Sequence, residues 1–214
     1  YQQTSSDTAQ TLAHEIDPLN EMLWRMPMRR LESESIRDSL LSVAGTLDRS
    51  PGGPPVMISN PASGLSRVKQ EPTPTSNLRR SIYLFARRVY PLSFLEVFDS
   101  PIVAVNCTRR MSSATVLQSV TQLNDTFVLE NATNVARRIQ QMIHEDTERQ
   151  IVEAWRIVLT REPEPETLAR CQNFLAAQQD LYEQENAEKQ EATAQALTDL
   201  CHMLLCTNEF LYVE

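Results

Sequence analysis

Apolar residues recur at helical spacing through most of the second half of the chain. They return every three or four positions, which places them along one face of an α-helix. After Pro101 there is no glycine, and Pro163 and Pro165 are the only prolines, so little interrupts the pattern. We expect a helical bundle over residues 113–214, with helices near residues 113–123, 126–144, 147–160, 165–185 and 190–207.

The stretch Cys107–Glu130 leads into this bundle. Arg109 and Arg110 precede a Ser/Thr-rich turn, and an apolar stripe at helical spacing follows the turn. The stripe consists of Val116, Leu117, Val120 and Leu123. We expect a loop that brings two guanidinium groups to a helical core, with the stripe belonging to that core.

Two helices are predicted in the N-terminal part. Asp17-Pro18 has the chemistry of a helix start, with the carboxylate at the N-cap and proline in the first turn, and Pro27 would end that short element. A stronger helix begins at Glu32 or Ser33 and runs to about Leu47. Its apolar stripe consists of Ile36, Leu40, Val43, Ala44 and Leu47.

The segment between these helices and the bundle is irregular. All four glycines and six of the twelve prolines fall between residues 45 and 74, which predicts a long Pro/Gly-rich loop over residues 48–78. Residues 80–88 are the best strand candidate, because they are rich in β-formers and apolar at both parities, as in a strand buried on both faces.

Together these patterns predict a mainly α fold, an irregular helical domain with one or two short β-strands and a long loop. We expect residues 1–214 to be the C-terminal part of one helical domain. Its parts are lead-in helices (1–47), the loop (48–78), a strand and arginine-rich core segment (79–112) and the bundle (113–214).

Charge and composition restrict the function classes. The net charge of −8 argues against nucleic acid as a partner, because phosphate contacts require a basic surface. Residues 111–214 hold 17 acidic and 7 basic residues, which fits solvated helix surfaces. Eighteen of the twenty basic residues are arginine, through either genome composition or selection for planar bidentate contacts.

Cysteine, histidine and hydropathy patterns give no further site. The four cysteines lack a C-x-x-C pair and the three histidines are far apart, so we expect neither a metal site nor a haem attachment in this chain. The spacing leaves open whether the cysteines are free or form disulfides. No run approaches 18 apolar residues, so no membrane span is expected, and without an initial Met we interpret the chain as a C-terminal piece of a longer protein.

Paired arginines are the main candidate for a binding site. Five Arg-Arg pairs occur, four of them at the ends of predicted elements in the N-terminal half. The candidate residues for a ligand site or ion network are Arg80, Arg88, Arg109, Arg110 and Glu32. Guanidinium groups at such places either form ion pairs within the protein or bind a carboxylate, phosphate or sulfate group.

Asp38 and Asp99 are the carboxylates that we would test for acid/base catalysis. A glycoside hydrolase needs two carboxyl groups about 5–10 Å apart across a cleft. The sequence does not reveal that separation, and a helical aspartate beside an apolar stripe is more typical of a salt-bridge partner.

Seven segments follow the order and spacing found in one known family. They are LWRMPMRRLESESIRDSLLSVAGTLD (23–48), GGP (52–54), RRSIYLFARR (79–88), FLEVFDSP (94–101), CTRRMSSATVLQSVTQLNDTFVLENA (107–132), AWRIVLTREP (154–163) and LCHMLLCTNEFLYVE (200–214). They resemble the C-terminal part of the planctomycete cytochrome-associated domain of unknown function 1553. The resemblance implies a secreted, periplasmic or extracellular multidomain protein with a c-type cytochrome-like region elsewhere, so haem would belong to that region and not to this chain.

The resemblance implies no reaction and no catalytic residue. We therefore expect a non-catalytic structural or ligand-binding module whose partners are other domains of the same polypeptide and a glycan. One alternative is a hydrolase of anionic, sulfated or uronic polysaccharide, with Asp38 or Asp99 as acid/base and the arginines as anion clamps. Another is a docking module for a redox partner, which would suit the acidic helices.

Overall fold

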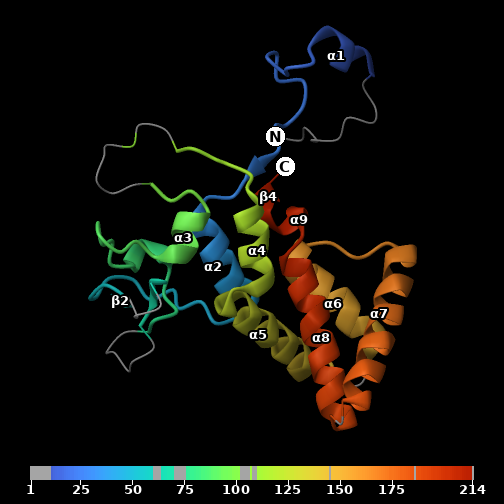
Figure 1. Ribbon diagram of the computed structural model, residues 1–214. Helices are drawn as coiled ribbons and strands as arrows, with labels where there is room; N and C mark the ends of the chain where they lie inside the picture. The colour runs from blue at the N-terminus through green and yellow to red at the C-terminus, as the bar shows by residue number, and fades with distance from the viewer. Residues whose placement is uncertain are drawn as a thin grey trace.

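The computed structural model describes residues 11–59, 64–69, 76–101, 107, 110–144, 146–185 and 187–213. Helices dominate, and the strands are short (Figure 1). The elements are α1 Thr11–Ile16, β1 Arg29–Arg30, α2 Ser33–Val43, β2 Ile58–Ser59, β3 Arg67–Val68, the 3₁₀ helix η1 Ser81–Tyr83, α3 Ser93–Val97, α4 Val116–Asn124, α5 Thr126–Met142, α6 Thr147–Leu159, α7 Pro165–Gln184, α8 Lys189–Leu205, α9 Asn208–Leu211 and β4 Tyr212–Val213. The fold is mainly α, as predicted.

The C-terminal bundle is the best-packed part of the molecule. Helix α8 lies between α5 and α7, and α6 packs against all three (Figure 1). The predicted helices agree with the observed bounds to within three residues, because their apolar stripes are long and few breakers interrupt them. The buried stripe of α8 includes Leu197, Leu200 and Leu204, each at most 1% exposed.

The N-terminal half attaches to this bundle through α2. Its apolar face packs on α3, η1 and α5, and Ile36 and Leu40 are fully buried there. Strand β1 pairs antiparallel with β4, so Arg29 lies opposite Val213. Strands β2 and β3 form a second antiparallel pair inside the predicted loop. Helix α1 lies apart from the body in Figure 1.

Helix α4 is oriented opposite to the prediction. Val116, at the start of the expected core stripe, is 80% exposed, and Leu117, Val120 and Leu123 are exposed too. The side chains that face inward are Gln118 and Gln122, which are 7% and 2% exposed. The Gln118 amide donates to the carbonyl of Val97 at 3.0 Å, so a polar contact holds the start of the inner face of this helix.

The strand predicted at residues 80–88 is not present. Ser81–Tyr83 forms the 3₁₀ helix η1, and Leu84 makes only an isolated bridge to Val56. Ile82, expected to be buried, is 75% exposed. The N–H of Leu84 donates to the carbonyl of Ser81, so the chain turns before a ladder can extend.

The prediction of a helix that starts at Asp17 is also wrong. Helix α1 ends at Ile16, and the carboxylate of Asp17 accepts hydrogen bonds from the N–H groups of Glu21 and Met22 in a turn. Asn20 and Leu23 have positive φ angles of 55°, a conformation that cannot continue a right-handed helix.

Candidate functional site

Arg30 and Asp99 form the centre of a polar cluster that joins β1, the end of α3 and the segment before α4. Nη2 of Arg30 donates to Oδ2 of Asp99 at 2.7 Å and to the carbonyl of Phe98 at 3.1 Å. Nη1 donates to the carbonyl of Ser113 at 2.7 Å. The N–H and hydroxyl of Ser113 donate to the Asp99 carboxylate in turn. Protein donors therefore hold both oxygens of Asp99.

These contacts keep Asp99 ionised. Burial alone would raise the pKa of Asp99, but hydrogen bonds from the Ser113 N–H, the Arg30 guanidinium and the Ser113 hydroxyl outweigh it, so the pKa lies below its ordinary value. A general acid at neutral pH needs the opposite shift. The Asp99 backbone also has a positive φ of 62°, a strained conformation that the surrounding contacts hold in place.

Asp38 lies in a second polar cluster, which, like the cluster around Asp99, joins separate segments of the chain. Its Oδ1 accepts hydrogen bonds from the N–H and the hydroxyl of Ser81, both at 2.7 Å. Nη1 of Arg37 lies 3.5 Å from the same oxygen, and Nε of Arg80 lies 4.0 Å from Oδ2. The carboxylate thus fixes η1 against α2.

The buried guanidinium of Arg79 explains how the Pro/Gly-rich turn is held. Its Nη1 donates to the carbonyl of Pro54 at 3.0 Å, and its Nη2 donates to the carbonyls of Ser50 and Gly52. The guanidinium also lies 3.8 Å from the ring centroid of Tyr83. Residues 50–54 therefore wrap around one arginine.

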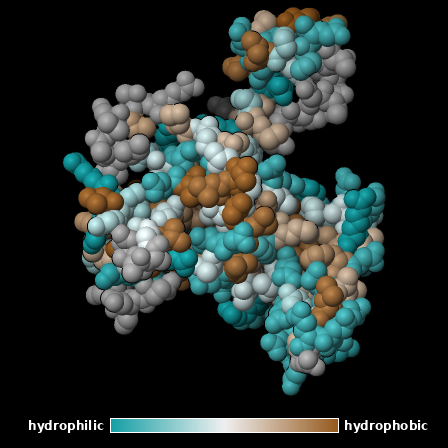
Figure 2. Space-filling model, viewed as in Figure 1, coloured by the Kyte–Doolittle hydropathy of each residue, from teal (hydrophilic) through white to brown (hydrophobic). Residues whose placement is uncertain are grey.

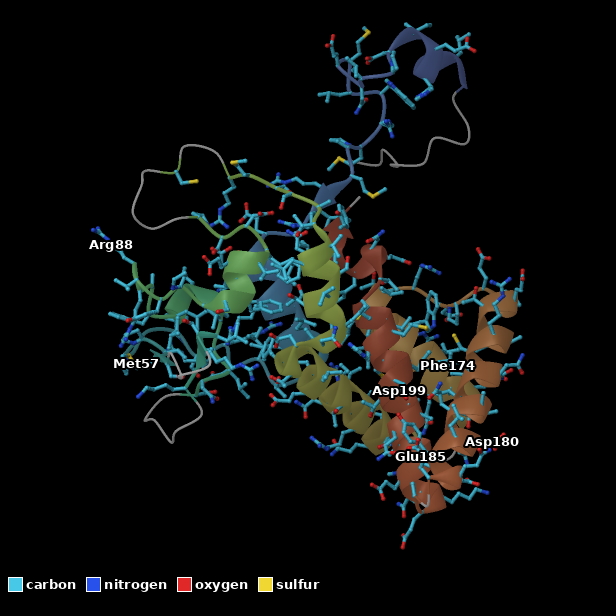
Figure 3. All side chains as sticks on the ribbon, in the orientation of Figure 1. Met57, Arg88, Phe174, Asp180, Glu185 and Asp199 are labelled. Carbon is cyan, nitrogen blue, oxygen red and sulfur yellow. The ribbon has the colours of Figure 1, made fainter. Side chains whose placement is uncertain are left out.

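Of the other predicted site residues that the structure describes, Arg110 and Glu32 meet, whereas Arg80 and Arg88 lie elsewhere. Arg110 pairs with Glu34, at 2.6 Å from Nη1 to Oε2, and with Glu32, at 3.2 Å. Arg80 belongs to the Asp38 cluster. Arg88 is exposed and points away from the body in Figure 3. Arg109 lies outside the described residues.

A pocket of about 490 Å³ lies between α2, the β2–β3 pair, α3 and the start of α5. This size is typical of small-molecule sites. We call it the α2/α5 pocket. Apolar side chains that include Leu41, Phe94 and Phe127 form part of its wall. Neither Asp38 nor Asp99 lines it.

The polar part of the wall is balanced in charge. Two arginines, Arg37 and Arg67, and two acidic residues, Asp125 and Glu130, line the pocket. Three amide side chains also line the pocket, those of Asn77, Asn131 and Asn134. Donors and acceptors are therefore both present, and no single charge dominates.

Arg37 is the least expected member of this wall. Its side chain is 2% exposed, and its guanidinium donates to the carbonyls of Arg79 and Asn77 and to the hydroxyl of Ser81. Burial lowers the pKa of Arg37 to about 10, against the opposing effect of Asp38. The side chain is thus still charged at neutral pH.

The sequence contained a signal for Arg37. The side chain lies four residues before Leu41, and together the two widen the apolar stripe of α2. An arginine inside such a stripe must find buried acceptors. No sequence pattern predicted that Asn131 would line the pocket. In the structure its Oδ1 is buried and accepts no hydrogen bond from the described residues.

Metal and thiol chemistry find no support in this part of the molecule. Among the residues that the structure describes, no three His, Cys, Asp or Glu side chains gather as metal ligands would. Cys171, Cys201 and Cys206 form no disulfide with one another. Burial raises the pKa of Cys201 to about 12 and that of Cys206 to about 11, so both are unreactive at neutral pH. None of the described helices is both long and apolar enough to cross a membrane.

Comparison with known proteins gives the family. The family described as PSD1, protein of unknown function (DUF1553), matches residues 1–175, which is most of the chain. The chain belongs to this family. No curated protein and no solved structure matches it significantly. The resemblance noted from the sequence is confirmed at the level of the family, whose description assigns no activity.

Proposed function

We propose that this PSD1 chain is a non-catalytic binding module that holds a saccharide unit in the α2/α5 pocket. The observation that carries the proposal is the pocket's balanced wall, in which guanidinium, carboxylate and amide groups stand beside apolar surface. A sugar hydroxyl both donates and accepts hydrogen bonds, so a ring of hydroxyls suits such a wall. Phe127, which is only partly buried, adds apolar surface against which the C–H groups of a sugar ring can pack.

A hydrolase is less well supported by this geometry. Asp38 and Asp99 belong to two different clusters, each tied by hydrogen bonds to Ser81 or Ser113. Both lie outside the lining of the pocket. The carboxylates that do line it are Asp125 and Glu130, and Asp125 is occupied as N-cap of α5, where its side chain accepts from the Phe127 N–H.

The wider setting of the module follows from its resemblance to cytochrome-associated relatives. We place it in a secreted or periplasmic multidomain protein whose c-type cytochrome-like region, with any haem, lies elsewhere. The acidic residues of the C-terminal half would suit a redox partner with a basic surface, but their salt bridges are exposed and scattered, as for Arg156–Glu162 and Arg170–Glu166. The pocket is therefore the better-supported site.

The proposal is tested by calorimetric titration of the chain, which measures the affinity for neutral monosaccharides, for uronic acids and for an aliphatic carboxylate. Arg67 is exposed at the pocket and donates to Thr126 Oγ1 at 2.8 Å. Arg67→Ala should weaken saccharide binding about fivefold or more, through loss of one charged donor. Arg149→Ala, at an exposed site on α6, should leave binding unchanged. The proposal fails if no saccharide binds to the chain, or if Arg67→Ala and Arg149→Ala bind saccharide with the same affinity.

A second role is supported by the inverted orientation of α4. We propose that its outward face contacts another domain of the same polypeptide. Figure 2 shows a hydrophobic patch over α4, and residues 111–124 contain no charged side chain. The face consists of Val116, Leu117, Val120 and Leu123. Apolar area of this kind on a folded surface commonly marks a contact site.

Hydrogen exchange tests this contact. Amides of residues 116–124 should exchange more slowly in a longer polypeptide that contains the neighbouring domains than in the 214-residue chain. Exchange in α7, which serves as internal reference, should be the same in both. Equal exchange of α4 in the two proteins would exclude the contact.

A further inference from the structure

Three arginines converge on a second hollow, of about 540 Å³, where the end of α2 meets the C-terminal half of α5. They are Arg49, Arg137 and Arg138, and we call this site the arginine hollow. Its lining contains no carboxylate. In a chain with a net charge of −8, three cations gathered without an acidic residue require a physical explanation.

The guanidinium groups of the hollow lack ionic partners within the described residues. Arg137 donates from Nη1 to Oδ1 of Asn134 at 2.7 Å, and Arg138 donates from Nη1 to the carbonyl of Val43 at 2.8 Å. Arg49 forms no hydrogen bond or ion pair with the part of the chain that the structure describes. Several arginines elsewhere are paired with carboxylates, namely Arg30, Arg110, Arg156, Arg161 and Arg170.

The carboxylate of the neighbouring residue, Asp48, lies outside the lining of the hollow. Asp48 precedes Arg49 in the chain, and its Oδ1 accepts from the N–H of Ser50 at 2.9 Å. The hydroxyl-bearing residues Ser42 and Thr46 do line it. The lining therefore combines positive charge with small polar groups.

The backbone holds Arg138 at the edge of the hollow. Gly45 has a positive φ of 73°, and a Cβ at this position would lie 3.4 Å from Cδ of Arg138. Glycine thus allows the arginine stem to lie across the turn that ends α2. Its guanidinium there caps the carbonyl of Val43 and offsets the negative end of the helix dipole.

From this arrangement we infer that the arginine hollow is an oxyanion site for a sulfate or phosphate group. Guanidinium groups bind such groups through short, charge-assisted and often bidentate hydrogen bonds. A doubly charged tetrahedral anion would also relieve the mutual repulsion of the three cations. The inference is independent of the saccharide pocket, although Thr46 and Asn134 line both.

The inference is tested by titrating the chain with sodium sulfate and with potassium phosphate while chloride keeps the ionic strength constant. Sulfate also stabilises proteins without binding to them, so binding is followed by calorimetry and by backbone NMR shifts rather than by melting temperature alone. We expect saturable shifts at residues 45–49 and 134–141, and none with chloride.

Substitutions identify the groups responsible. Arg49→Gln and Arg137→Gln are at exposed positions, so both variants should fold normally. Each should weaken binding about tenfold, as expected for the loss of one charge-assisted contact. Arg170→Gln on α7 serves as the matched control and should bind like the unmodified chain. Equal binding by all variants, or non-saturable shifts that chloride reproduces, would overturn the inference.

Two further ligands distinguish the source of the oxyanion. Phenyl phosphate carries a phosphate group that can be doubly charged on a larger body, and phenyl sulfate carries a singly charged sulfate group on the same body. If they bind as tightly as the inorganic ions, the hollow accepts an oxyanion attached to a larger molecule. If only the inorganic ions bind, the site takes free anions.

Discussion

Buried arginines connect parts of this protein that are distant in the sequence. Arg30, Arg37 and Arg79 are each at most 7% exposed, and each donates to two or more backbone carbonyls of loops. A guanidinium has five N–H donors in a fixed plane, whereas an ammonium offers three from one point. The preference for arginine over lysine therefore has a structural use at these positions.

Asp99 gives a prediction at the same scale. Its pKa in the folded chain is lowered, so the stability that it contributes is complete above the ordinary aspartate pKa of about 4 and is lost as the pH falls below that value. Asp99→Asn should lower the free energy of unfolding by about 3 kcal/mol at pH 7, because Arg30 loses its carboxylate partner. Urea unfolding at pH 7 and between pH 5 and pH 2.5 measures both effects.

The control for this prediction is Asp180→Asn, at an exposed position on α7 (Figure 3). It should leave the free energy of unfolding within about 0.5 kcal/mol of the unmodified chain. An Asp99→Asn variant with the same stability and the same acid sensitivity as the unmodified chain would contradict the role given to the cluster.

At the scale of elements, the helices α5 to α8 could be predicted because their apolar residues pack directly on one another. The conformation of residues 80–88 and the buried face of helix α4 could not, because distant polar groups decide them. Ser81 is held by Asp38, which lies 43 positions earlier, and Gln118 is held by the carbonyl of Val97. Local periodicity contains no information on such contacts.

The same reason limited prediction of the site. Asp99 and Arg110 could be singled out as charged groups near element ends, yet their partners Arg30 and Glu34 depend on how β1 and α2 are placed. Asp125, Asn131 and Asn134 reach the α2/α5 pocket only because α5 crosses α2. Pockets formed between elements follow from packing and not from a motif.

The orientation of α4 predicts an unusual tolerance to charge. Val116→Lys, at a position that is 80% exposed, should change the free energy of unfolding by less than about 0.5 kcal/mol. Leu200→Ala in α8, which is fully buried, should lower it by about 2–5 kcal/mol. Urea denaturation of both variants measures the contrast. A large loss of stability in Val116→Lys would mean that this face is part of the core.

At the scale of the whole molecule, the two halves share one apolar core. The cluster of buried residues runs from Ile36 in α2 through Phe98 to Leu204 in α8. Arg138 adds a polar link between α5 and the end of α2. We therefore expect residues 29–213 to unfold in a single transition, with α1 and the following turn outside it.

Tryptophan fluorescence can separate these parts. Trp155 in α6 is 8% exposed, whereas Trp24 lies in the N-terminal segment, where its indole N–H donates to the carbonyl of Asp17. In Trp24→Phe, the fluorescence and far-UV circular dichroism transitions should have the same midpoint. In Trp155→Phe, the fluorescence of Trp24 should change gradually during unfolding, without the cooperative transition that circular dichroism reports. Two separate midpoints in Trp24→Phe would contradict the shared core.

The antiparallel pairing of β1 with β4 has a topological consequence. The register places Arg29 opposite Val213, and the N–H of Leu31 donates to the carbonyl of Leu211 at 2.8 Å. A linker of a few residues would therefore join position 213 to position 29 without disturbing either segment. A circular permutant of residues 29–213 with this linker, opened between α7 and α8, would keep the helix contacts of the core, while α8, α9 and β4 would leave the ribosome first instead of last.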